Sequence, residues 1–129
     1  MKRLSIKKFI PGIAWFFVVM ALTCTPGDDL PKEGIFHWLN LTDFDKLVHA
    51  GIFGLLAVLF CYPFAKADLS YSKKIKYFII ICLLTAVWGY CIEVIQLFWV
   101  EGRTYDLFDW TADSIGALLA FFFSWKVFL

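Results

Sequence analysis

The segment Tyr77–Phe98 reads YFIIICLLTAVWGYCIEVIQLF, and it decides the fold class. A helix needs about 20 mainly apolar residues to cross the hydrocarbon core of a bilayer, and this segment supplies them. Glu93 is its only charged residue. A charged side chain at the centre of a membrane helix costs about 2.5–3.5 kcal/mol on insertion scales. Such a residue therefore usually has a partner or a function.

Three further apolar segments accompany residues 77–98, at about residues 9–24, 47–64 and 107–129. The chain of 129 residues is 61% hydrophobic, and its mean hydropathy of +0.75 is too high for an ordinary soluble domain. Helices of a soluble protein also carry a polar face, which these segments lack. We therefore predict an all-α fold, an integral membrane four-helix bundle, in a single domain over residues 1–129.

The loops differ in charge, although the net charge is only +1. Basic residues precede the first segment, fill the link between the second and third, and end the fourth. They are Lys2, Arg3, Lys7, Lys8, Lys66, Lys73, Lys74, Lys76 and Lys126. The other two loops are mainly acidic. Because cytoplasmic loops are rich in lysine and arginine, we predict that both termini and the middle link are cytoplasmic. Trp99 and Trp110 then fall at the outer boundary, where aromatic residues are enriched.

The first segment has a second interpretation as a secretion signal, because basic residues precede it and Cys24 follows it. A lipoprotein cleavage site has small residues before the cysteine, and Leu22 and Thr23 fit this poorly, so an uncleaved helix is favoured. The four cysteines show no CxxC spacing, and no disulfide framework is predicted. The basic residues follow one membrane face, so no nucleic-acid partner is predicted.

Polar residues stand where the apolar segments meet the two acidic loops. The set comprises Asp45-Lys46-x-x-His49, Glu93-x-x-Gln96, Arg103 and Asp109-x-x-x-Asp113-x-x-Gly116. At a rise of about 1.5 Å per residue, His49, Glu93 and Asp113 each lie roughly 6–9 Å inside their helix ends. We predict that these three form the floor of a polar pocket that opens to the outside. Gln96 is expected beside them, with Asp45, Lys46, Arg103 and Asp109 around the mouth.

The polar residues of the fourth segment lie on its packing side. Ala112, Gly116 and Ala120 recur every four residues on the face that carries the two aspartates. This small-x-x-x-small pattern allows another helix to approach closely. Small residues also lie below Glu93 in the third segment, at Cys82, Ala86 and Gly89. Bulky residues below His49 in the second segment are expected to fill these grooves. They are Phe53, Leu56 and Phe60.

The ordered polar set resembles the VanZ-like family, small bacterial membrane proteins named after a teicoplanin-resistance protein. The resemblance covers about residues 40–120. The family usually has asparagine where this chain has Asp113, and often proline where Gly102 stands. We expect the extra carboxyl of Asp113 to stay protonated or to pair with Lys46 or His49. The resemblance implies a multi-pass protein of the bacterial inner (cytoplasmic) membrane, with a link to the cell envelope and to glycopeptide susceptibility. It supplies no agreed reaction.

Several functions are compatible with this set. The pocket would bind a lipid head group or a lipid-linked cell-wall intermediate, with Lys46 and Arg103 on its anionic part. Alternatively, an enzyme would act on such a lipid with His49 or Glu93 as general acid or base. A proton relay through His49, Glu93 and Asp113 is a third interpretation, although no inverted repeat is evident. The fourth interpretation is structural: the polar residues bond the helices to one another and have no other function. No oligomeric state follows from the sequence.

A metal site is the weakest of these interpretations. His49, Glu93, Asp109 and Asp113 have the side-chain types of metal ligands. They come from separate helices, however, without a tight motif such as HExxH. We therefore predict no metal ion and no cofactor.

Overall fold

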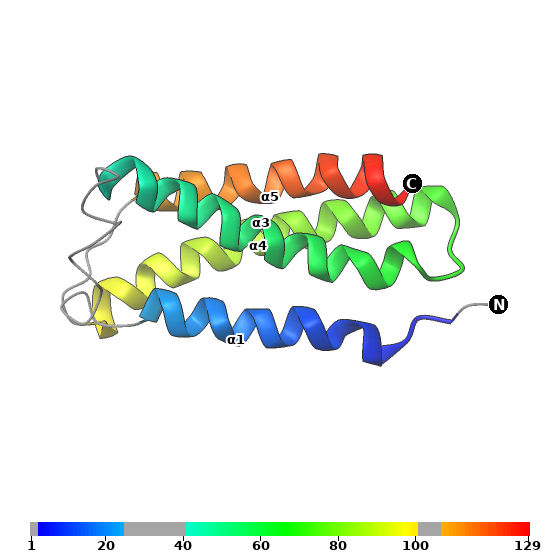
Figure 1. Cartoon of the computed structure of the whole chain (residues 1–129), viewed down its shortest axis with the longest axis horizontal. Coiled ribbons are helices and arrows are strands. Elements are labelled where there is room, and N and C mark those ends of the chain that lie inside the picture. The colour runs from blue at the N-terminus through cyan, green and yellow to red at the C-terminus, as the bar shows by residue number, and fades with distance from the viewer. Residues whose placement is uncertain (1–2, 25–40, 101–106) are drawn as a thin grey trace.

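The computed structural model describes residues 3–24, 41–100 and 107–129, apart from the side chains of residues 41–45. The described residues form helices and no strand, so the all-α prediction is confirmed. In chain order these are the 3-10 helix η1 (Ile6–Phe9) and the α-helices α1 (Ile10–Cys24), α3 (Leu41–Ala65), α4 (Tyr71–Trp99) and α5 (Leu107–Phe128) (Figure 1).

Within the described residues, four helical stretches are long and apolar enough to cross a membrane, as predicted. They are Ile6–Cys24, Lys46–Ala65, Tyr71–Trp99 and Leu107–Phe128. The third begins six residues before the predicted boundary at Tyr77, because hydropathy marks the lipid-embedded part of a helix and not its hydrogen-bonded start. Ser70 caps this early start, since its side chain accepts a hydrogen bond from the backbone N–H of Lys73 at 3.4 Å.

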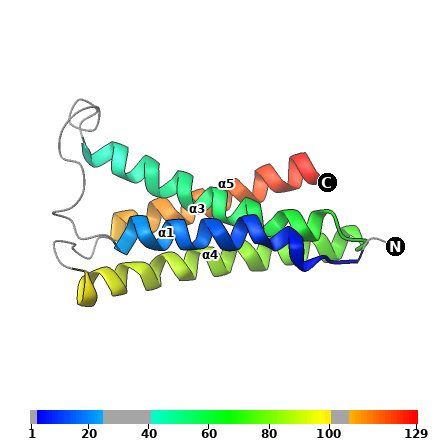
Figure 2. The same cartoon turned by 60° about the horizontal axis from the view of Figure 1, so that its bottom comes forward.

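The helices run lengthwise beside one another (Figures 1 and 2). We call the end that holds η1, the Ala65–Tyr71 link and the end of α5 the terminal end. The opposite end, where α1 and α4 finish and α3 and α5 begin, is the distal end. The most extensive contact is between α3 and α5, whereas α1 packs on α3 and α4 and, within the described residues, not on α5. Figure 2 shows α3 and α5 crossing near their middles.

The backbones of α3 and α5 touch at this crossing. A Cβ atom added at Gly116 would overlap the carbonyl oxygen of Ala50 and would lie 2.9 Å from its Cα. A Cβ atom added at Gly54 would lie 3.1 Å from the carbonyl oxygen of Gly116. The small residues predicted to allow close approach therefore do so. The prediction that bulky α3 residues fill this groove is wrong at Gly116, where the small residues of α3 lie instead.

Two aromatic residues of α3 pack against α1. Phe53 is fully buried in a cluster with Val19 of α1 and Ile92 of α4. A Cβ atom added at Gly12 would lie 3.2 Å from the ring of Phe60. Small residues of α3 therefore pack on α5, whereas Phe60 packs on α1 and Phe53 packs on α1 and α4. Lys46 begins the side of α3 that carries Ala50 and Gly54 and faces α5, and His49 lies between that side and Phe53.

The outer faces of the helices are apolar. Large hydrophobic side chains stand exposed along them, including Leu83, Leu84, Leu118, Leu119 and Phe123. In water such surfaces would favour aggregation, whereas lipid chains solvate them at no cost. The packing thus agrees with a protein that spans a membrane.

Candidate functional site

Five ionisable side chains come together near the distal end, and we call them the ionisable cluster. They are Lys46 and His49 of α3, Glu93 of α4, and Asp109 and Asp113 of α5. Residues three or four positions apart share one face of a helix. Because α3 and α5 both begin at the distal end, these faces meet as two levels of paired residues.

The outer level is the pair Lys46 and Asp109. Lys46 Nζ lies 2.6 Å from Asp109 Oδ1, the distance of a charge-assisted hydrogen bond. The side chain of Lys46 is 27% exposed and that of Asp109 is 13% exposed. This pair therefore remains in contact with the surroundings at the distal end.

The inner level is the pair His49 and Asp113. His49 Nδ1 lies 2.8 Å from Asp113 Oδ1, and the side chain of Asp113 is 0% exposed. The imidazole is stacked on the ring of Phe53, with centroids 6.3 Å apart and planes 5° apart. An ionised Asp113 accepts the Nδ1–H hydrogen bond and thereby directs the lone pair of the ring to Nε2. The expectation that Asp113 pairs with Lys46 or His49 is confirmed for His49.

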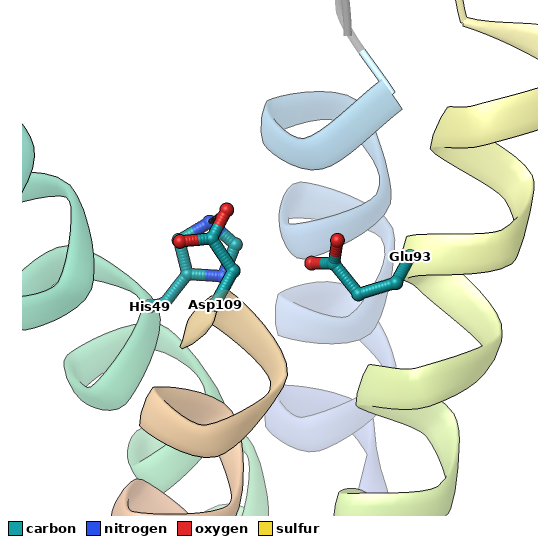
Figure 3. Close-up of side chains that lie close together, drawn as sticks. All are labelled: His49, Glu93 and Asp109. Atoms are coloured by element: carbon teal, nitrogen blue, oxygen red, sulfur yellow. Dashed lines mark ion pairs between the residues drawn. The ribbon is translucent and has the colours of Figure 1, made fainter. Parts of the chain in front are cut away.

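The second ring nitrogen of His49 faces the outer level. His49 Nε2 lies 3.8 Å from Asp109 Oδ2, which is too long for a hydrogen bond. Glu93 is fully buried on α4, and Figure 3 shows its carboxyl group directed toward His49 and Asp109 from the other side. One ligand atom from each of these three side chains lies within 4.8 Å of the others. Three helices thus bring together a histidine and two carboxylates.

Gly89 makes room for Asp113 against α4. A Cβ atom added at Gly89 would lie 2.9 Å from Asp113 Oδ2 and 3.0 Å from Asp113 Cβ. A larger residue at this position would force the Asp113 side chain to move. The glycine predicted to permit helix packing therefore also sets the position of a polar side chain.

Gln96 joins α4 to α1. Its Nε2 donates a hydrogen bond of 2.6 Å to the carbonyl oxygen of Thr23, and both residues are buried. The last carbonyl groups of a helix lack partners within the helix, so this bond satisfies one at the end of α1. The hydroxyl of Thr23 turns back and donates to the Val19 carbonyl at 2.7 Å. Gln96 lies one turn beyond Glu93, and its hydrogen bond to Thr23 holds α4 against α1.

The comparisons with known proteins agree with the polar pattern. The family model for VanZ/LLP1 matches residues 5–129. The chain belongs to the VanZ/LLP1 family. The resemblance seen over residues 40–120 is thereby confirmed, and the match extends through the first helix. No curated protein and no solved structure matches the chain.

Two predicted site residues of this VanZ/LLP1 protein lie outside the described part. Arg103 belongs to residues 101–106, and Asp45 has no described side chain. Their places at the mouth of the site stay predictions. The structure does bring together Lys46, His49 and Asp109 with the two buried carboxyls, as the sequence predicted.

Trp110 of this VanZ/LLP1 protein was expected at the outer membrane boundary but points into the bundle. Its Nε1 donates a hydrogen bond of 2.9 Å to the carbonyl oxygen of Ala86 in α4. Its ring also contacts Tyr90, with centroids 5.9 Å apart. Hydropathy gave its depth but not its direction. Trp99, by contrast, is largely exposed at the end of α4.

Two surface grooves lie at the terminal end of the VanZ/LLP1 bundle, away from the ionisable cluster. One has a volume of about 470 Å³ and lies between the beginning of α4, at Tyr71, and the end of α5, at Trp125. The other, of about 240 Å³, lies between Leu4 and Tyr77. Both are lined mainly by apolar and aromatic side chains. The outward pocket predicted at the cluster stays a prediction.

Proposed function

We propose that this VanZ/LLP1 protein binds the head group of a membrane lipid or of a lipid-linked cell-wall intermediate in the bacterial cytoplasmic membrane. The observation that supports this most is a gradient of exposure through the cluster. The exposed fraction of the side chain falls from 27% at Lys46 to 13% at Asp109 and 0% at Asp113. Polar residues that only join helices need no such continuity with the surface.

Both kinds of charge in the cluster suit a head group of this class. Carboxylates accept hydrogen bonds from the hydroxyl and amide groups of a sugar. A lysine ammonium binds phosphate as a point charge, and Lys46 lies on the exposed side of the cluster. Asp109 keeps that ammonium in place. Arg103 is the second cation that we expect to reach the phosphate, from the loop before α5.

The distribution of lysines supports a site on the outer side of the membrane. The described lysines, with one exception at position 46, lie in the parts of the helices and the link that form the terminal end. They are Lys7, Lys8, Lys66, Lys73, Lys74, Lys76 and Lys126. Under the positive-inside rule the terminal end faces the cytoplasm, and the distal end then faces outward. A ligand would reach the cluster from the outer leaflet.

The experiment is native mass spectrometry of the protein with its co-purified lipids. The variant Lys46→Met keeps the length of the side chain and removes its charge. The matched control is Lys73→Met, which removes an exposed lysine at the terminal end. We expect a lipid adduct on the wild type and the control, and its loss from Lys46→Met. Equal lipid profiles for all three proteins would contradict head-group binding at the cluster.

The same proposal gives a reason for a link to glycopeptide susceptibility. A protein that holds a lipid-linked cell-wall intermediate would compete with an antibiotic that binds that intermediate. Expression of the wild type in a teicoplanin-sensitive bacterium should then change its susceptibility, and expression of Lys46→Met should not. Equal susceptibility with either protein, at matched protein levels in the membrane, would remove this link.

Acid–base catalysis on such a lipid is the second candidate. The hydrogen bond between His49 and Asp113 favours it, because a carboxylate that fixes one ring nitrogen leaves the other to exchange protons. Purified protein would be incubated with lipid-linked precursors and the mixture analysed for products. An enzyme gives a product that His49→Gln abolishes, whereas a binding protein retains only the intact ligand.

A further inference from the structure

The gap between His49 and Asp109 has the dimensions of a metal site. Bonds of about 2.0–2.2 Å place two ligand atoms of one ion at most about 4.4 Å apart. His49 Nε2 and Asp109 Oδ2 are 3.8 Å apart, beyond hydrogen-bond distance and within this limit. Glu93 brings a third ligand atom, and all three lie within 4.8 Å of one another, so a small movement of side chains would bring the third atom within the limit as well. We propose that His49, Glu93 and Asp109 bind one divalent transition-metal ion.

The hydrogen bond below His49 prepares the ring for this role. Histidines that bind metals nearly always donate their other N–H to a carboxylate or carbonyl group, which fixes the tautomer and the ring direction. His49 Nδ1 has such a partner in Asp113 Oδ1, at 2.8 Å. The stacking on Phe53 holds the plane of the ring. Asp113 is therefore a positioning residue, and His49 Nε2 is the atom directed at the ion.

Asp109 is oriented in the same way from the other side. Lys46 binds its Oδ1, and the oxygen nearest to the imidazole is the other one, Oδ2. Each of these two ligands is thus held by a neighbour that does not itself bind the ion. Glu93 enters from a different helix and is fully buried, so the ion would join α4 to the pair formed by α3 and α5 (Figure 3).

The ligand set restricts the kind of ion. One imidazole and two carboxylates suit Zn²⁺ and Mn²⁺, whereas Mg²⁺ and Ca²⁺ prefer oxygen ligands alone. An ion with two positive charges would lie among three carboxylates in a medium of low dielectric constant, where their attraction is strong. Three protein ligands leave further coordination positions for water or for an oxygen of a ligand.

The test begins with the metal alone. Protein stripped with a chelator would be reloaded with Zn²⁺ or Mn²⁺, and its metal content measured by elemental mass spectrometry. We expect one ion per chain for the wild type and a loss of at least tenfold in affinity for Glu93→Gln and His49→Gln. Asp68→Asn removes an exposed carboxylate near the terminal end and is the matched control, which should bind as the wild type does.

A spectroscopic measurement locates the ion in the wild type and does not depend on variants that fold. Co²⁺ in place of the natural ion should give the visible absorption of a nitrogen and oxygen site. The chain has four free cysteines, and a thiolate charge-transfer band would place the ion there and overturn the proposal. Asp113→Asn should retain the ion but lower its affinity about 10–100-fold, as expected for loss of an outer partner.

Two outcomes would refute the site outright. One is a metal content that stays the same in Glu93→Gln, His49→Gln and Asp68→Asn, each shown to be folded by circular dichroism. The other is a wild type that binds no Zn²⁺ or Mn²⁺ above the level of protein in which both Glu93 and His49 are replaced. Metal binding would stand even if no lipid bound at the cluster, because its readout is the ion itself.

Discussion

Gly116 of α5 lies directly on the main-chain carbonyl group of Ala50 in α3, so that no side chain fits between the two helices there. This contact fixes the distance between the helices that carry four of the five cluster residues. A position at which one carbon atom cannot be added without moving a backbone is a sensitive place to test the fold.

Gly116→Ala should destabilise the protein by about 1–3 kcal/mol or more, because the added methyl group meets backbone atoms that cannot rotate away. The measurement is the thermal unfolding midpoint in detergent. Gly51→Ala is the control, since a Cβ atom at Gly51 meets nothing within 4 Å. The control should unfold at the wild-type temperature or above it. Similar midpoints for the two variants would argue against the close crossing.

Gly89→Ala should disturb the cluster more than the fold. The new Cβ atom would lie 2.9 Å from Asp113 Oδ2 and 3.0 Å from Asp113 Cβ, so the side chain has to move as a whole. The hydrogen bond to His49 should lengthen or break. Nitrogen-15 NMR of labelled histidine measures this directly, because the chain has only two histidines. An unchanged His49 spectrum would show that Asp113 does not depend on the space at Gly89.

Gln96→Leu should lower the free energy of unfolding by about 1–3 kcal/mol, because it leaves the buried carbonyl of Thr23 without this donor. Thr85→Val is the control, since the hydroxyl of Thr85 donates to Ile81 within α4 itself. We expect the control to have the smaller effect on the thermal midpoint. If Gln96 supported the proposed metal site and not the packing of α1, Gln96→Leu would bind less metal but keep the thermal midpoint of the wild type.

The orientation of the bundle can be tested with fusions at the C-terminus. Lys126 and the lysines of the Ala65–Tyr71 link and of the first turns of α4 predict that Leu129 is cytoplasmic. A fluorescent protein fused after Leu129 should therefore fold and fluoresce. Alkaline phosphatase fused at the same place should be inactive, because it requires the oxidising exterior. Active phosphatase would reverse the orientation and place the cluster toward the cytoplasm.

The sequence predicted the spans and the common level of His49 and Asp113, for a simple reason. Hydropathy is summed over a whole helix, and depth follows from the rise per residue. His49 and Asp113 were placed at one level by counting, and the structure brings them within hydrogen-bond distance. The four-residue repeat of Ala112, Gly116 and Ala120 likewise predicted which face of α5 packs closely.

The partners of these faces could not be predicted, because periodicity gives no rotation of one helix about another. Phe53 and Phe60 were expected in the grooves of the small residues, but Phe60 packs on Gly12 of α1 and Phe53 lies between α1 and α4. Gln96 was expected beside Glu93, and its amide reaches Thr23 in α1. The sequence predicted no metal ion, because ligands on separate helices form no sequence motif, and metal binding at the cluster is a proposal from the structure.

Because α3 and α5 touch at one point, the distance of each residue from this crossing decides how far it would move if the angle between the helices changed. His49 adjoins the contact at Ala50, whereas Lys46 and Asp109 lie farther along the two arms. A change in the angle between the helices would therefore alter the inner spacing little and the outer spacing more. Such a change would separate Lys46 from Asp109 more than it separates His49 from Asp113, so the angle between the two helices would set the width of the outer level.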